Sequence, residues 1–242
     1  MNGKIQKDNN KIISFYRRLV FGSKFKKQNL DKNTVFEYCF ENAWIDMASH
    51  TYIVNIHDKN INSDVYKNKH KNEIQKLKSN LKSDVKHYFF ESNSLIVDNE
   101  LLHAKILQIS SFIHSNNRLD MSIQLTIGQA QKVVNMFYKY LYTFNELDFI
   151  KTIDFKECDC PIDNINLTRI NKWLLKNKKT LNNELLVFYN DLRNISLTYK
   201  YKEKCWSKID SLEDYCMIQK VIDYIVNKEN YSSRLDFDFD WE

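Results

Sequence analysis

Apolar residues recur at intervals of three and four along much of the chain, separated by lysine, asparagine and other polar residues. Ile74, Leu77, Leu81 and Val85 show the pattern clearly, because lysines occupy several of the positions between them. This period is typical of a helix with one buried stripe and one solvated face. The same spacing predicts helices, caps included, over seven further segments: residues 11–21, 33–45, 98–113, 126–144, 161–174, 181–197 and 210–225.

The segment that begins at Thr126 carries the clearest helix signal. Thr126 and Gln129 are spaced as in a capping box, in which each side chain bonds the backbone N–H of the other residue. Apolar residues then continue through Phe144 on several sides of the helix, so we expect a central and largely buried element. Asn33 or Thr34 is expected to cap the helix that follows it.

Two short segments have strand character. Residues 51–56 are rich in β-branched side chains, and residues 235–242 alternate apolar with acidic side chains at the period of a strand. With three glycines and one proline in 242 residues, tight hairpin turns are scarce. We therefore predict an all-α or predominantly α fold, to which residues 51–56 and the C-terminal tail could add a small two-strand element.

The shortage of glycine also excludes several catalytic motifs. A nucleotide-phosphate loop needs several glycines that approach the anion, and a nucleophile elbow needs glycine on both sides of a serine; the chain contains neither pattern. The six histidines include no His-x-x-x-His pair, which excludes a metalloprotease-like motif. These exclusions leave open whether the protein is an enzyme.

Length and composition indicate one helical domain over residues 1–242, because no flexible linker divides the chain. No apolar run approaches the ~20 residues that span a bilayer, so we expect a cytoplasmic protein without a membrane partner. The five cysteines are then expected to be reduced, packed thiols. A zinc ion held by Cys158, Cys160, Cys205 and Cys216 is the alternative, but paired Cys-x-x-Cys motifs are missing, and we predict no metal and no cofactor.

Positive charge is concentrated in three stretches, residues 1–30, 59–86 and 169–179, of a chain whose formal net charge is +5. Such stretches bind phosphates through counterion release. The alternative is a set of solvated helix faces in the lysine-rich composition of an AT-rich genome, such as that of a phage, a mobile element or a low-GC bacterium. The candidate nucleic-acid contacts in these stretches are Arg17, Arg18, Lys67, Lys78, Lys82, Arg169, Lys172 and Lys176.

Two further lysines lie within the predicted central helix. Lys132 and Lys139 are seven residues apart and therefore share a face. Their stems are expected to pack while the ammonium groups reach solvent or a carboxylate. The alternative is a face that contacts phosphates.

Residues 120–175 resemble the helix-hairpin-helix DNA glycosylases in the order of their parts. In that family a glycine-containing turn opens a helix that binds the DNA backbone, and a later Pro-Val-Asp or similar triplet places the catalytic aspartate at the start of another helix. Gly128 and Pro161-Ile162-Asp163 occupy these two places here. The resemblance implies DNA-backbone contact at Gly128 and catalysis by Asp163. The chain lacks the first glycine and the proline of the family's hairpin, and Ala130 stands where bifunctional members carry a Schiff-base lysine. The alternative role of Asp163 is that of a helix N-cap.

The acidic and aromatic tail, residues 235–242, carries Phe237, Phe239 and Trp241 beside four carboxylates. These aromatic residues either anchor the tail to the core or bind a protein partner.

Together the patterns predict a basic cytosolic binding protein, associated with DNA or RNA or forming a complex with a protein through its N-terminal helix or its tail. The alternatives are a DNA glycosylase-like or nucleoside N-glycosidic hydrolase that uses Asp163, and an adaptor or inhibitor that acts through the tail.

Overall fold

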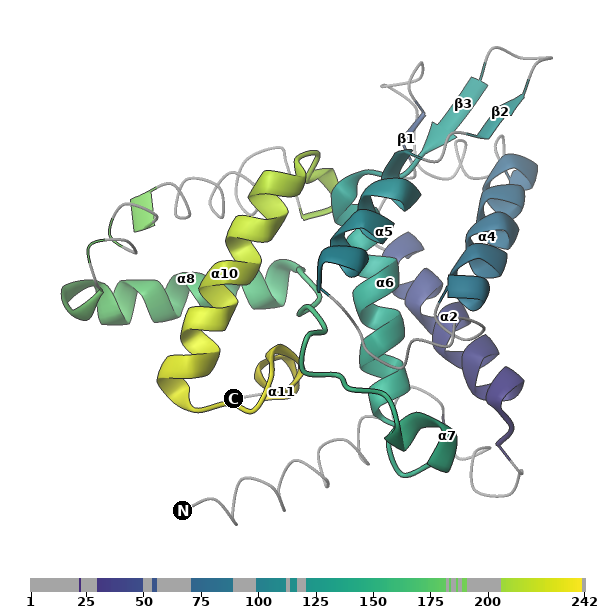
Figure 1. Cartoon of the computed structure of the whole chain (residues 1–242). Helices are drawn as coiled ribbons and strands as arrows, with labels where there is room; N and C mark the ends of the chain where they lie inside the picture. The colour runs from purple at the N-terminus through teal and green to yellow at the C-terminus, as the bar shows by residue number, and fades with distance from the viewer. Residues whose placement is uncertain are drawn as a thin grey trace.

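The chain folds mainly into helices, which confirms the predicted fold class (Figure 1). The computed structural model describes residues 22, 30–49, 54–55, 71–88, 99–111, 114–116, 121–181, 183, 186, 189–190 and 206–240. The predicted helix 11–21 lies outside these residues, and the predicted helix 181–197 falls almost entirely outside them. Within the described part of the chain, no helix is long and apolar enough to cross a membrane.

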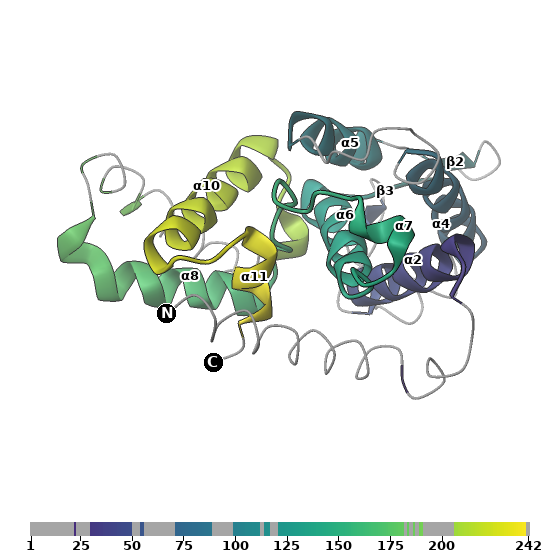
Figure 2. The same ribbon diagram turned by 60° about the horizontal axis from the view of Figure 1, so that its bottom comes forward.

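Helix α6 (Ile127–Tyr142) runs through the middle of the molecule in both views (Figures 1 and 2). The predicted capping box is present, because Thr126 Oγ1 accepts a hydrogen bond from Gln129 N at 3.1 Å and Thr126 N donates to Gln129 Oε1 at 3.0 Å. Every residue from Ile127 to Leu141 is buried, which confirms the prediction of a central helix. The polar residues of α6 must therefore find partners inside the protein.

Three helices lie on one side of α6. Of these, α2 and α5 contact α6, and α4 packs against α2. Phe36 of α2 meets Phe137 of α6 edge to face, with ring centroids 5.5 Å apart. The apolar stripe predicted at residues 74–85 lies on α4, where Leu77, Leu81 and Val85 are buried. The bounds are α2 (Lys32–Ala48), α4 (Lys71–Lys86) and α5 (Asn99–Ser111).

The N-cap of α2 differs from the prediction. Asp31 caps the helix, not Asn33 or Thr34, and its Oδ1 accepts a hydrogen bond from Thr34 N at 2.7 Å. Asp31, Asn33 and Thr34 are all residue types that cap helices, so residue type alone did not indicate which of them would be the N-cap. The cap lies near the predicted start, because both candidates belong to the first turn.

A small antiparallel sheet caps one end of the helices (Figure 1). Its strand order is β1-β3-β2, with Val54 opposite Gln124 and Ser115 opposite Ser122. Residues 54–55 therefore form a strand as predicted, but their partner is residues 121–124 and not the tail. The bounds are β1 (Val54–Asn55), β2 (His114–Asn116) and β3 (Met121–Gln124).

Helices α8, α10 and α11 lie on the other side of α6, whereas α7 lies near the C-terminal end of α6 on the side of α2 (Figure 2). Helices α8 and α10 pack together, with Trp173 and Tyr224 edge to face at a centroid distance of 5.8 Å. In both views α8 is at the outer edge of the molecule. The bounds are α7 (Asp148–Lys151), α8 (Asn164–Asn177), η3 (Lys178–Thr180), η4 (Trp206–Lys208), α10 (Leu212–Glu229) and α11 (Arg234–Phe239), where η marks a 3-10 helix.

Residues 235–239 of the tail are helical and do not form the predicted strand. Ser233 begins α11, and its Oγ accepts a hydrogen bond from Asp236 N at 3.1 Å. All residues of α11 are buried, including Asp236 and Asp238. Alternating apolar and acidic residues predict a strand only if the acidic side faces water. In α11 the acidic side chains are buried against partner groups, so the alternation of apolar and acidic residues does not indicate a strand.

Candidate functional site

Helix α8 and the turn η3 that follows it form a strongly basic segment. Residues 164–183 contain no Asp and no Glu. Neighbours three or four residues away therefore offer no carboxylate to the cations of this segment, and its positive charge is not offset along the helix. The five cations are Arg169, Lys172, Lys176, Lys178 and Lys179.

Local sequence explains why this helix forms where it does. Asp163 is the N-cap, and its Oδ1 accepts hydrogen bonds from Ile165 N at 3.0 Å and Asn166 N at 2.9 Å. The buried side of the helix repeats at helical spacing and packs toward the core. It consists of Asn166, Leu167, Ile170 and Leu174.

The lysines occupy the opposite side of α8. Lys172, Lys176 and Lys179 are exposed and are spaced four and three residues apart, so they lie on one face. Toward α10, Trp173 Nε1 donates a hydrogen bond to Glu229 Oε1 at 2.6 Å. We call Lys172, Lys176 and Lys179 the α8 lysine face.

Arg169 is three residues before Lys172 and lies close to the lysine face, but its side chain is directed at α11. Its Nη1 donates to the carbonyl oxygen of Phe237 at 2.7 Å, and its guanidinium lies 4.2 Å from the centroid of the Phe237 ring. Arg169 is half-buried and its guanidinium is engaged by Phe237, so Arg169 helps to hold α11 against α8 and we do not count it as part of the lysine face.

The basic residues predicted on α4 are far from this face. Lys78 forms an ion pair with Glu41 of α2, and Lys82 pairs with both Glu37 and Glu41. Burial of Glu41 would raise its pKa, but the two lysine ammonium groups outweigh burial and lower it. Figure 1 places α4 and α8 at opposite ends of the molecule. The remaining predicted contacts, Arg17, Arg18 and Lys67, lie outside the described residues.

Lys132 and Lys139 reach carboxylates rather than solvent. Lys132 Nζ lies 2.7 Å from Asp163 Oδ2, and Lys139 Nζ lies 2.6 Å from Asp238 Oδ2. Their side chains are 7 % and 5 % exposed. The first of the two predicted arrangements is therefore present, and neither ammonium group forms part of an exposed face.

Gly128 has a packing role. Its N–H donates to the carbonyl oxygen of Ile209 at 2.9 Å, so it is not available to a phosphate. A Cβ at this position would lie 2.0 Å from the carbonyl oxygen of Trp206. Glycine allows α6 and η4 to approach this closely, which corrects the interpretation of Gly128 as a DNA-backbone contact.

Asp163 is engaged through both carboxylate oxygens. Oδ1 caps α8, while Oδ2 accepts the hydrogen bond from Lys132. Burial raises the pKa of Asp163, but Lys132 and the backbone N–H of Asn166 outweigh burial, and the net effect lowers the pKa. An ionised N-cap with an ion-pair partner agrees with the structural role predicted as the alternative to catalysis.

Phe237 and Phe239 are core residues. Their side chains are 3 % and 1 % exposed. Phe239 packs against Tyr142 at a centroid distance of 5.9 Å, and Phe237 packs against Tyr231 at 5.8 Å. They are not accessible to a protein partner, which corrects the prediction of a docking tail at these two positions. Trp241 lies outside the described residues.

Sequence reasoning did not find the network of buried amides around residues 160–162. Gln131 Nε2 donates to the carbonyl oxygen of Ile162 at 2.9 Å, and Gln131 Oε1 accepts from Ile162 N at 3.1 Å. Gln219 of α10 bonds both backbone groups of Cys160 in the same manner, at 2.7 and 3.2 Å. Polar residues at positions 131, 132, 135 and 139 lie on one side of α6, and this spacing is a signal that could have indicated the network.

Asp159 is the centre of a second buried network. Its side chain is 0 % exposed, and Arg234 Nη1 donates to Oδ1 at 2.6 Å. Tyr215 donates its hydroxyl to Oδ2 at 2.5 Å. Arg234 also pairs with Asp223, with Nε 2.5 Å from Oδ1. These bonds connect α10, α11 and the segment that precedes α8.

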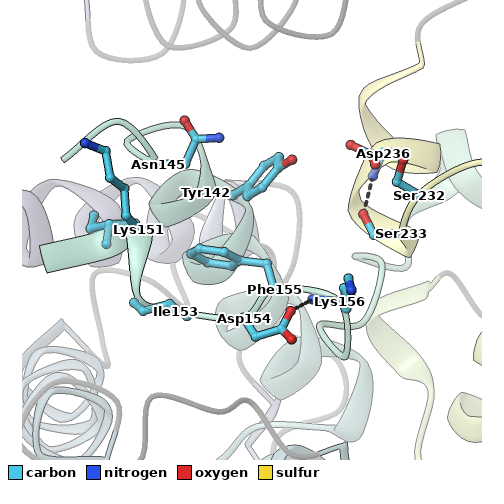
Figure 3. A pocket seen from close by; sticks show the side chains of 11 residues that line it. Tyr142, Asn145, Lys151, Ile153, Asp154, Phe155, Lys156, Ser232, Ser233 and Asp236 are labelled. Carbon is cyan, nitrogen blue, oxygen red and sulfur yellow. Dashed lines mark hydrogen bonds between the residues drawn. The ribbon is translucent and has the colours of Figure 1, made fainter. Parts of the chain in front are cut away.

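A pocket of about 360 Å³ opens beside α7 and α11 (Figure 3). The hydroxyl of Tyr142 faces Asp236 across it. Burial raises the pKa of Asp236, and burial together with the Asp236 charge raises the pKa of Tyr142 to about 12. The volume is sufficient for a small molecule. Its charged residues, Lys151, Lys156, Asp154 and Asp236, have both signs and favour no ligand class.

Burial makes most of the described cysteines unreactive. Cys39, Cys158 and Cys160 are fully buried, and burial raises the pKa of each thiol well above its ordinary value. Among the described residues no three His, Cys, Asp or Glu side chains are arranged to hold a metal ion. Cys205 lies outside the described residues.

No protein-family model, curated protein or solved structure matches the chain. The resemblance to helix-hairpin-helix glycosylases therefore stays a prediction.

Proposed function

We propose that the protein binds a polyanion, with nucleic acid as the natural class, through the α8 lysine face. The observation that carries the proposal is a helix of exposed lysines without a single carboxylate over residues 164–183. Its charges add along one face at the outer edge of the molecule, and such a surface attracts phosphates and releases their counterions.

The other predicted basic residues explain why the proposal is limited to this face. Lys78 and Lys82 are paired with glutamates, and Lys132 and Lys139 are buried against aspartates. Lysine binds phosphate as a point charge and carries little base specificity. We therefore expect binding that depends on salt and is indifferent to sequence.

The test is a titration of labelled single- and double-stranded DNA and RNA across a salt series. Each lysine–phosphate contact contributes about 0.9 to the log–log salt slope on duplex DNA and about 0.7 on a single strand. Changing Lys172, Lys176 and Lys179 together to Gln should therefore reduce the slope by about 3 or about 2, respectively.

A matched control removes the same charge elsewhere. Lys71, Lys76 and Lys156 are exposed and lie outside residues 164–183, so their joint change to Gln lowers the net charge equally without altering the α8 lysine face. The proposal requires the control variant to keep most of the wild-type slope. Equal loss in both variants would show an effect of net charge alone, and no binding by the wild type at low salt would refute the function itself.

A further inference from the structure

Three side chains with chemical reactivity meet where α5, α10 and the segment before α8 come together. Cys216 of α10 and His103 of α5 contact each other, with Sγ 3.4 Å from Nδ1. The other ring nitrogen of His103, Nε2, lies 2.7 Å from Asp159 Oδ2. The imidazole thus lies between a thiol and a carboxylate, an arrangement that can take a proton from the thiol and hold it.

The surroundings fix the orientation of the histidine ring. Asp159 is fully buried and is bound by Arg234 and by the hydroxyl of Tyr215. The ring of Tyr215 also meets the His103 ring edge to face, at a centroid distance of 5.5 Å. With Nε2 directed at the carboxylate, Nδ1 is directed at Cys216. Among the described contacts, the titratable and charged groups near the histidine include Asp159, the Arg234 and Tyr215 side chains bound to it, and Cys216.

Electrostatics favour the protonated ring. The hydrogen bond to Asp159, followed by the one to Cys216, raises the pKa of His103 to about 9. At neutral pH the imidazole carries a positive charge next to the sulfur. A neighbouring cation stabilises a thiolate relative to a thiol.

Cys216 also differs from the buried cysteines in its access to solvent. The side chain of His103 is 22 % exposed, and Cys216 is partly exposed. Cys39, Cys158 and Cys160 are fully buried and have no comparable cation at hydrogen-bond distance among the described contacts. Exposure and a cationic neighbour together are the features of reactive cysteines.

We propose that Cys216 is a nucleophilic thiolate that exchanges with small-molecule disulfides. The Cys216 sulfur attacks one sulfur of the disulfide, the bond between the two sulfurs of the small molecule breaks, and a mixed disulfide forms at Cys216. The departing thiolate takes the proton from the His103 imidazolium. The small disulfide is the oxidant, so no other reactant is required.

The position of Cys216 favours exchange over acyl transfer. It is the fifth residue of α10, so its N–H is bonded within the helix and cannot stabilise a tetrahedral oxyanion. Thiol–disulfide exchange develops no such oxyanion and needs only a thiolate, access and a proton for the leaving group. The proposal does not depend on the polyanion function.

The test is the rate at which oxidised glutathione modifies Cys216 between pH 5 and pH 9, with peptide mass mapping to separate it from the other four cysteines. At pH 6 an ordinary thiol is only about 0.3 % ionised. A thiolate held by the His103 imidazolium is present in a larger fraction, although each such thiolate is less nucleophilic, so Cys216 should react at least about tenfold faster than free cysteine. His103→Gln should remove this advantage and shift the pH–rate profile toward that of an ordinary thiol, and Cys216→Ser should lose the modified peptide.

The wild-type profile keeps the proposal testable even if His103→Gln is poorly folded. A wild-type rate that rises with a midpoint near about 8.5, as for an unperturbed thiol, would overturn the proposal. An unchanged profile in a folded His103→Gln variant, as judged by circular dichroism, would also overturn it.

Discussion

Asp163 allows the energy of a helix cap to be separated from that of an ion pair, because its two oxygens serve different partners. Asp163→Ala removes both, whereas Asp163→Asn keeps an oxygen that can cap α8 and removes the charge opposite Lys132. Asparagine and aspartate are equally good N-caps. The difference between the two variants therefore reports the cap.

The magnitudes follow from burial. Loss of an N-cap costs about 1 kcal/mol. Breaking a fully buried ion pair costs about 3–5 kcal/mol, and an exposed pair contributes about 0–1 kcal/mol. Lys132 is 7 % exposed and Asp163 is 23 % exposed, so the pair lies between these limits and its loss should cost about 2 kcal/mol. We expect about 3 kcal/mol for Asp163→Ala and about 2 kcal/mol for Asp163→Asn.

The assay is urea unfolding followed by tryptophan fluorescence, with the exposed neighbour Asn164→Ala as control. With a slope of about 3 kcal/mol per molar urea, Asp163→Ala should lower the midpoint by about 1 M and the control should leave it nearly unchanged. Because the pKa of Asp163 is lowered in the folded state, its contribution is present above the unfolded pKa of about 3.9 and is lost as pH falls through the folded value. The difference between wild type and Asp163→Asn should therefore shrink below about pH 4.

Two results would refute this reasoning. Equal destabilisation by Ala and Asn would show that the cap contributes nothing, and a loss below about 0.5 kcal/mol in both would show that the pair behaves as a surface contact. The same variants test the glycosylase prediction, because Asp163→Asn removes the proposed catalytic charge while it preserves the cap. Release of base from DNA by the wild type but not by folded Asp163→Asn would favour catalysis.

Three further predictions concern the core. Gly128→Ala should destabilise by about 3 kcal/mol in urea unfolding, because its Cβ would collide with the carbonyl of Trp206, and a loss below about 1 kcal/mol would show that η4 moves freely. Phe239→Ala should cost about 3–5 kcal/mol because the ring is 1 % exposed, whereas an unchanged melting temperature would place the tail outside the core. The pKa of His103 is raised to about 9, so its contact with Asp159 stabilises fully below the unfolded pKa of about 6.5 and is lost as pH rises through about 9. The stability gap between wild type and His103→Gln, measured in urea from pH 6 to pH 10, should narrow over that range, and a constant gap would contradict the assignment.

Local signals were readable from the sequence. Thr126 and Gln129 are three residues apart, and Asp163 is adjacent to the helix that it caps, so the starts of α6 and α8 could be predicted without knowledge of the fold. The basic character of residues 169–179 was equally local. The sequence did not indicate which lysines stay exposed, because that depends on carboxylates that tertiary packing brings to Lys132 and Lys139.

The remaining features depend on contacts between distant residues. His103 and Cys216 are 113 positions apart, and His103 and Asp159 are 56 apart, so no local sequence motif predicts that the three side chains are in contact. The prediction of a strand at residues 235–242 was wrong for a related reason. Its acidic residues suggested a solvated side, but Lys139 lies opposite Asp238, and a buried cation makes an acidic side chain compatible with the interior.

Helix α11 has a consequence for how the chain is made. Asp159 and Lys139 are synthesised long before Arg234 and Asp238, the groups that neutralise them. A ribosome that has completed only the first 200 residues holds a chain in which Lys139 lacks Asp238 and Asp159 has His103 but lacks Arg234, so the buried charges are less fully neutralised and this part of the core is less stable. The contacts that α11 makes with Lys139 and Asp159 therefore form only once residues 234–238 have been synthesised, and a product truncated before them should be degraded more readily.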